Sequence, residues 1–177
     1  MIANALTFIT KQMNDYMKRQ VPSHDTFIEL SPVTSGSAQG KLFLSLVDIE
    51  EDALLGKKLP KRGNEFMVAA PPMSLNLDVL VSVSPQTPYV EGMKHLSDAM
   101  AFFQAFPYFD TSGTTMPNGI HKMTIEMIRT EAKNDLWLSL GADYQPSVMY
   151  KMRLSLMDSE LIKAEIPAIK KPKKPTS

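Results

Sequence analysis

The sequence predicts an α+β fold, with a mostly antiparallel or mixed sheet flanked by helices. Segments 73–84 and 143–158 alternate apolar and polar side chains with the period of two that is typical of strands. Segments 2–20 and 89–105 instead repeat apolar side chains every three or four residues, as amphipathic helices do. The whole chain gives the order α-β-β-β-α-β-α-β, which favours helices packed on one face of a sheet.

The first half of the chain contains one helix and three strands. The helix occupies residues 2–20 and ends before Pro22. Its expected apolar stripe consists of Ile2, Leu6, Ile9, Met13, Tyr16 and Met17. The strands are expected at residues 24–30, 41–49 and 73–84, with a small polar loop at 33–40 and a long connection at 50–65. A connection of that length inside a compact domain is often functional.

The second half adds two helices and two strands. The longer helix follows Pro88 and stops before Pro107, with an expected stripe of Val90, Met93, Leu96, Met100 and Phe103. A turn-rich loop at 110–119 precedes a strand at 120–128. Asn134 is a candidate cap for a short helix at 135–140, which Gly141 closes and Trp137 pins to the sheet.

The chain divides into residues 1–158, a single α+β domain, and residues 159–177, an extended tail. The tail is rich in proline and lysine and lacks the apolar side chains that a core needs. Its four lysines, Lys170, Lys171, Lys173 and Lys174, are candidates for contacts with a partner. A proline-stiffened basic segment suits a groove on another protein.

The composition excludes several classes of function. Lys and Arg number 19 and Asp and Glu number 19, so nothing in the net charge favours nucleic acid or an anionic membrane. Cysteine is absent, which removes disulfides and thiolate chemistry and favours folding inside the cell. We find no targeting signal and no apolar run of the ~20 residues that a membrane helix needs.

Catalytic and metal-binding motifs are also missing. His24, His95 and His121 are never four residues apart, as zinc-binding helices require. The acidic stretch "VDIEED" at 47–52 lacks the alternating oxygen ligands and the glycine of a calcium loop. No glycine-rich segment builds a phosphate loop or a dinucleotide fingerprint. We therefore expect no catalytic residue, cofactor or metal, and a non-enzymatic protein.

The connection at 50–65 carries a basic run. Its cations are Lys57, Lys58, Lys61 and Arg62. A basic loop with interleaved aromatic residues suits nucleic acid, but here no aromatic residue occurs until Phe66. A solvated loop or a loop that faces a protein partner is favoured over nucleic acid.

Several blocks of the sequence, in order, resemble one family. The most specific are "SLVDIEED", "PPMSLNLDVLVS" and "LWLSLGADYQPSVMYKMR", within a similarity that covers residues 1 to about 158. The chain resembles the cap, or tail-terminator, proteins of extracellular contractile injection systems of the antifeeding-prophage and virulence-cassette type. These are relatives of contractile phage tail terminators, and the resemblance implies the same sheet flanked by helices.

The resemblance implies a mechanical function. Such caps form a six-fold ring that ends the inner tube and anchors the last sheath ring, so the expected partners are other copies of the chain, the tube protein and the sheath protein. Assembly is expected in the cytoplasm, on a particle that is either released or anchored. Two alternatives stay open: a phage tail-completion protein that contacts a head connector, and a small α+β ligand-binding or enzymatic domain.

A ring also suggests a use for the second face of strand 143–158. Met149, Lys151 and Arg153 offer adaptable packing and charge, which subunit interfaces favour. Together with Lys57, Lys58, Lys61 and Arg62 they are the expected subunit-interface residues. The alternative is that Lys151 and Arg153 are only solvated.

Overall fold

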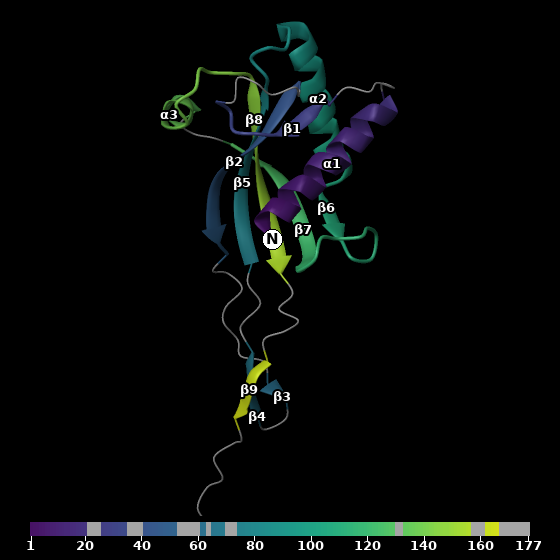
Figure 1. The fold of residues 1–177 in the computed structure, drawn as a ribbon, viewed down its shortest axis with the longest axis vertical. Helices are drawn as coiled ribbons and strands as arrows, with labels where there is room; N and C mark the ends of the chain where they lie inside the picture. Colours follow the sequence, from purple (N-terminus) through teal and green to yellow (C-terminus); the bar gives the residue numbers. More distant parts are fainter. Residues whose placement is uncertain are drawn as a thin grey trace, which may run out of the picture.

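The structure is a computed structural model, and it describes residues 1–20, 26–34, 41–52, 61–62, 65–69, 74–129, 133–156 and 162–166. These residues form three helices and nine strands in two sheets. Figure 1 shows a large sheet with helices packed against it and a small separate sheet beyond one end of it.

The main sheet has six strands in the order β1-β2-β5-β8-β7-β6. They are β1 (Ile28–Leu30), β2 (Leu42–Glu51), β5 (Ser74–Val83), β8 (Ser147–Leu156), β7 (Ile120–Ile128) and β6 (Tyr108–Asp110). Strand β1 lies parallel to β2, and every other neighbouring pair is antiparallel. The expected mostly antiparallel, mixed sheet of an α+β protein is therefore confirmed. Strand β6 falls where the sequence predicted no strand.

Two helices cover one face of this sheet, here called the inner face (Figure 1). Helix α1 (Ile2–Gln20) buries the stripe Ala5, Leu6, Ile9, Met13 and Met17, close to the expected one. The alternate residues of the central strands meet it, including Leu77, Val79, Tyr150, Met152 and Leu154. The amide of Asn14 ties the helix to β1, because it donates to the Ile28 carbonyl and accepts from the Phe27 and Ile28 amides.

Helix α2 (Tyr89–Ala105) buries Leu96 and Phe103 of the stripe that the sequence predicted, but not the whole of it. Its buried residues are Gly92, Leu96, Ala99, Phe102 and Phe103. The expected core residues Val90 and Met100 are exposed instead. Gly92 lies so close to the Val83 side chain that a Cβ atom there would collide with it. Small residues thus let the helix approach β5, and a search for large apolar side chains misses such a face.

The opposite, outer face of the sheet carries a smaller apolar cluster. Helix α3 (Lys133–Ser139) places Trp137 against Leu80, Met149 and Val33. Trp137 is buried, so its expected packing on the sheet is confirmed. The helix begins one residue before Asn134, so that residue is not the cap we expected, whereas Gly141 has the positive φ of +65° that closes a helix.

The second sheet consists of β3 (Lys61–Arg62), β4 (Glu65–Ala69) and β9 (Ile162–Ile166), in the order β3-β4-β9. The sequence predicted a connection and a tail in these places. Strand β3 follows β2, β4 precedes β5 and β9 follows β8. The strands of the small sheet therefore follow the order of β2, β5 and β8, the main-sheet strands to which they are connected along the chain. The small sheet lies beyond the end of the main sheet at which these connections are made (Figure 1).

Candidate assembly surfaces

Charged side chains from four adjacent strands line up across the outer face. The strand registers place Asp48, Asp78, Lys151 and Glu126 in one row, and Glu50, Asn76, Arg153 and Thr124 in the next row. The Lys151 Nζ lies 3.5 Å from Glu50 Oε2 and 3.6 Å from Asp78 Oδ1. The Arg153 guanidinium donates to Glu126 Oε1 over 2.7 Å. The cations of β8 are therefore paired with carboxylates of the same chain.

Asp78 is the most constrained carboxylate of these rows. Partial burial raises its pKa above the ordinary value, and the nearby Lys151 ammonium opposes this rise. Lys151 is consequently a neutralising group for a carboxylate that the sheet holds partly away from water. Its side chain is only 23% exposed, against 48% for Arg153.

The residues expected at a subunit interface occupy different environments. Met149 is buried beneath Trp137, so its side chain packs in the chain's own core. Lys151 and Arg153 lie on the outer face in the ion pairs given above. Lys61 and Arg62 form β3, of which only the backbone is described. Lys57, Lys58, Lys170, Lys171, Lys173 and Lys174 lie outside the described residues. An interface role for this set stays a prediction.

An apolar groove runs between the start of α1 and the β1–β2 edge of the main sheet. Its volume is about 400 Å³. Its lining residues are Ile2, Ala3, Leu6, Leu30, Ser31, Pro32, Leu44 and Leu46. Strand β1 covers β2 only over Leu42–Leu44. Among the described residues no strand pairs with that side of β2 beyond this point, so the groove adjoins an open stretch of strand.

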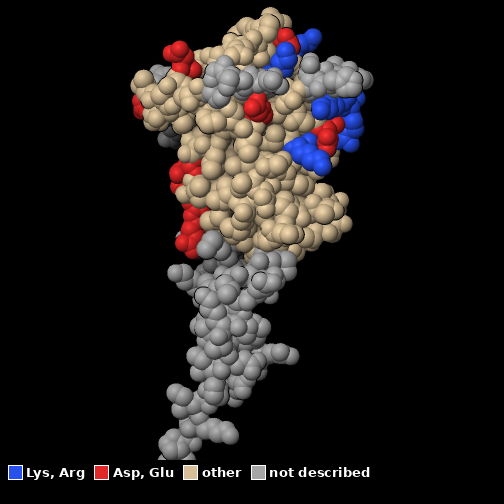
Figure 2. All heavy atoms as spheres, viewed as in Figure 1, with Lys and Arg blue, Asp and Glu red and all other residues tan. Residues whose placement is uncertain are grey.

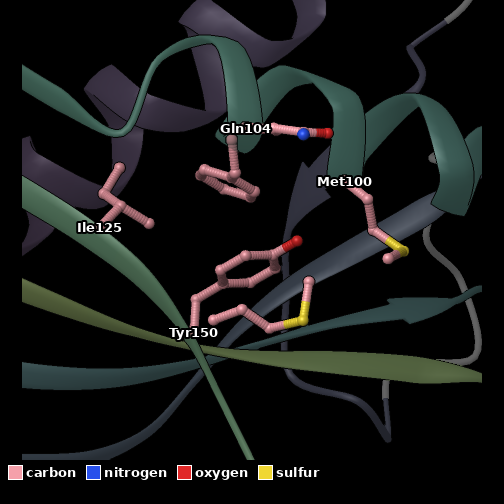
Figure 3. Close-up of a pocket in the computed structure, with 6 residues that line it drawn as sticks. Met100, Gln104, Ile125 and Tyr150 are labelled. Atoms are coloured by element: carbon pink, nitrogen blue, oxygen red, sulfur yellow. The ribbon is translucent and has the colours of Figure 1, made fainter.

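A second pocket, of about 380 Å³, lies between α2, β7 and β8 (Figure 3). The Tyr150 ring rises from β8 into it, with Met100 and Gln104 of α2 above and Ile125 of β7 to one side. The Tyr150 hydroxyl is buried and has no hydrogen-bond partner within the described part of the protein. Burial raises the pKa of this phenol to about 12. The sequence predicted no pocket here, and Met100, expected in the apolar stripe of α2, lines it instead.

Charge is distributed unevenly over the two lateral sides of the molecule. Figure 2 shows acidic side chains along the β2 side and a group of basic side chains at the far end of α1. The exposed acids of β2 are Asp48, Glu50 and Glu51. The exposed cations of α1 are Lys11, Lys18 and Arg19. The balanced net charge of the sequence therefore conceals an acidic β2 side and a stretch of α1 in which Lys11, Lys18 and Arg19 outnumber Asp15.

Within the described ranges, no three His, Asp or Glu side chains converge as metal ligands would. The acids of "VDIEED" are split by strand alternation, so Glu50 points to the outer face and Glu51 to the inner side. No described helix has the length and the apolar character needed to cross a bilayer.

The chain is similar in sequence to one protein family and in fold to solved structures. A family model described as the Pvc16 N-terminal domain matches residues 5–171. One similar structure is the sheath/tube terminator, in its extended state, of the PVC extracellular contractile injection system, with a TM-score of 0.53 and 16% identity over 94% of this chain and 62% of that chain. Another is the tube-terminating cap of the anti-feeding prophage, with a TM-score of 0.56 and 19% identity over 97% of this chain and 61% of that chain.

These similarities concern the fold of nearly the whole chain. The chain spans less than two thirds of the length of each of these two structures. No curated protein matches the sequence. The resemblance to cap, or tail-terminator, proteins that the sequence indicated is confirmed.

Proposed function

Because the chain belongs to the Pvc16 N-terminal domain family, we propose that it is the structural cap of a contractile injection system. In this function it binds the end of the inner tube, stops tube growth and anchors the last ring of the sheath. The observation that carries the proposal is the fold similarity of nearly the entire chain to two terminators of such particles.

The surfaces of the chain suit a mechanical protein. Both cations of the outer-face rows, Lys151 and Arg153, are held in ion pairs within the chain, and no cluster of metal ligands forms among the described residues. The apolar grooves and the oppositely charged sides instead offer contacts to other proteins. We propose that six copies form a closed ring, because the caps that the chain resembles are expected to form six-fold rings and identical subunits in head-to-tail contact close into such a ring.

The proposal also assigns contacts to the lysines near the end of the sequence. Lys170, Lys171, Lys173 and Lys174 would contact the sheath or the tube, and assembly would take place in the cytoplasm of the producing cell. The basic run Lys57, Lys58, Lys61 and Arg62 would face a protein partner in the same particle.

The test is tube assembly with and without the chain. We would express the tube and sheath proteins encoded beside it, and measure tube lengths and end structures by electron microscopy. We expect long tubes of uneven length without the chain, and one capped end with attached sheath when it is present. Tubes whose lengths and ends do not change would contradict the proposal.

The same experiment separates the alternatives. A tail-completion protein would also bind tube ends, but it would bind a head connector in addition. A chain that binds neither the tube nor a connector, and whose pocket at Tyr150 takes up a small molecule, would favour the ligand-binding alternative.

A further inference from the structure

The two lateral edges of the main sheet are both partly open. Strand β1 covers only the beginning of β2, as described above. On the other side, β6 covers β7 only from Lys122 to Thr124. No described strand pairs with the outer side of either strand beyond these stretches. Open strand edges are natural places for contact with another protein.

The β2 edge is apolar in its first half and acidic toward its C-terminal end. The groove of about 400 Å³ lies beside Leu44 and Leu46 of β2. The exposed Ile49 continues this apolar surface along the strand, and exposed carboxylates follow it on β2. We call the surface formed by the groove, Ile49, Asp48, Glu50 and Glu51 the acidic edge.

The β6 edge has the opposite character. Phe106 and Tyr108, at the end of α2 and in β6, are 40% and 59% exposed. The Phe106 ring lies 6.1 Å from the ring of Tyr16, and the Phe109 ring lies 5.4 Å from that of Phe8. These contacts hold α1 against the edge.

The cations of α1 accompany those aromatic contacts. Lys11 and Arg19 follow Phe8 and Tyr16 by three residues each, which puts each of them one helical turn further along α1. Both side chains are exposed, as is Lys18. We call the surface formed by Phe106, Tyr108, Lys11, Lys18 and Arg19 the basic edge.

We propose that the acidic edge of one copy of this chain receives the basic edge of the next copy. The two edges lie on opposite sides of the molecule, with acids on the β2 side and cations at the far end of α1 (Figures 1 and 2). This inference rests on the proposed function, since it names the surfaces through which the ring would close.

A second copy is the occupant that these surfaces fit. Exposed aromatic side chains on one edge match an apolar groove on the other, and the exposed carboxylates further along β2 match the cations beside the aromatic residues. Protein interfaces commonly combine an apolar centre with a polar rim of complementary charge. Because the two edges differ, the contact is head-to-tail, and head-to-tail contacts generate rings when their rotation closes.

The absence of cysteine allows a direct test by crosslinking. We would prepare Glu51→Cys on the acidic edge, Asp15→Cys beside the cations of α1, and a chain that carries both substitutions. A short bismaleimide is then added to the purified protein, free and bound to tube ends. We expect monomers from each single variant, dimers from their mixture, and a ladder of higher species from the double variant.

Charge exchange gives an independent measurement. We expect Asp48→Lys with Glu51→Lys, or Lys11→Glu with Arg19→Glu, to weaken self-association at least tenfold, and all four substitutions in one chain to restore it. Glu50 is kept because it pairs with Lys151. The control is Asp135→Lys with Asp143→Lys, since both acids are exposed but lie outside the two edges, and self-association should stay unchanged. Circular dichroism would verify that each variant folds.

The outcomes separate this inference from the proposed function. Single variants that crosslink to themselves, or a double variant without a ladder on tube ends that the native chain caps normally, would overturn the edge pairing and leave the cap function standing. A chain that neither caps tubes nor associates with itself would overturn both.

Discussion

Tyr150 is the residue whose environment is most unusual for its chemistry. Its ring packs against Phe103, with 4.3 Å between the ring centroids, and its hydroxyl is buried without a partner among the described residues. An unpartnered buried hydroxyl costs about 1–3 kcal/mol of folding free energy. The phenol is therefore tolerated at this position without contributing a hydrogen bond within the chain.

Two effects of Tyr150→Phe follow. At neutral pH we expect the free energy of unfolding to rise by about 1 kcal/mol, because the unpartnered hydroxyl is removed. At high pH the difference should grow. The unfolded phenol ionises near pH 10, whereas the buried one stays protonated to about pH 12, so its ionisation costs the native chain no stability below pH 10 and lowers it progressively as the pH rises from 10 to 12.

Urea unfolding between pH 7 and pH 12 would measure both effects. The native chain should lose about 2 kcal/mol more than Tyr150→Phe across the alkaline window. Tyr144→Phe is the matched control, since that side chain is exposed, and its curve should follow the native one. Parallel curves for the native chain and Tyr150→Phe would contradict the buried-phenol interpretation.

Among the elements, β8 is where charge and packing are most closely combined. Its inner residues Tyr150, Met152 and Leu154 lie in the core, while Lys151 and Arg153 face the carboxylates of β2, β5 and β7. Lys151 stands within the row that contains Asp48, Asp78 and Glu126. This position makes Lys151 a structural cation, whatever it does in an assembly.

Charge reversal on β8 should therefore depend strongly on position. We expect Lys151→Glu to lower the free energy of unfolding by about 2 kcal/mol, because a further carboxylate joins a partly buried acidic row. Arg153→Glu, with the same change in charge on a half-exposed side chain, should cost less than about 1 kcal/mol. Urea unfolding at low and high salt would compare them, and the larger loss should shrink in salt.

Equal losses at the two positions would argue against this electrostatic account. If the expected difference is found, Arg153→Glu becomes the suitable variant for asking whether the outer face takes part in ring assembly. Lys151→Glu would then confuse a loss of folding with a loss of contact.

The sequence predicted best those helices and strands whose core-facing residues are large and apolar. Strands β5 and β8 show the period of two in their sequence because their inner faces carry the large apolar residues of the core, and α1 shows its stripe because large apolar residues fill it. Helix α2 was misread because Gly92 and Ala99 form part of its buried face. Strand β6 was missed because its three residues are too few to show the alternation of apolar and polar side chains that marks a strand.

The surfaces were harder to predict than the elements. Met149 alternates with core residues, but its burial depends on Trp137, which belongs to a distant helix. The ion pairs of Lys151 join strands that lie far apart in the chain, with a separation of 101 positions between Glu50 and Lys151. A single sequence shows which face a residue takes in its own strand, but not which side chains lie beside it.

At the scale of the whole molecule, the two sheets share three strand connections. The buried core of the main domain lies within residues 5–156. Strand β9 pairs with β4 and not with the main sheet. A division of the chain near residue 158 into a domain and a tail stays a prediction, and β9 is the part of that tail which the structure shows in a sheet.

Two truncations would separate these parts. We expect chains that end at residue 158 or at residue 166 to unfold at the same temperature as the full chain, because neither loses a residue of the main core. Hydrogen exchange should rise at Glu65–Ala69 only in the shorter chain, which lacks the β9 partner of β4. A lower unfolding temperature for the shorter chain would show that the small sheet supports the main one.

The chain that ends at residue 166 also tests the role of the tail lysines. A chain that ends at residue 166 keeps β9 but loses Lys170, Lys171, Lys173 and Lys174. We expect it to retain less sheath on capped tubes, which electron microscopy would count against the full chain. Unchanged sheath retention would contradict a role for these lysines.

The repeated strand order of the two sheets has a mechanical consequence. A force applied to the small sheet reaches the main sheet through β2, β5 and β8 together, because each of these strands is connected along the chain to the small sheet at the same end (Figure 1). Because β2, β5 and β8 are pulled together from one end, the load falls in shear on the hydrogen bonds that join them to β1 and β7, since those bonds run across the strands. Many bonds then resist at once, whereas a pull on a single edge strand would peel them away one after another.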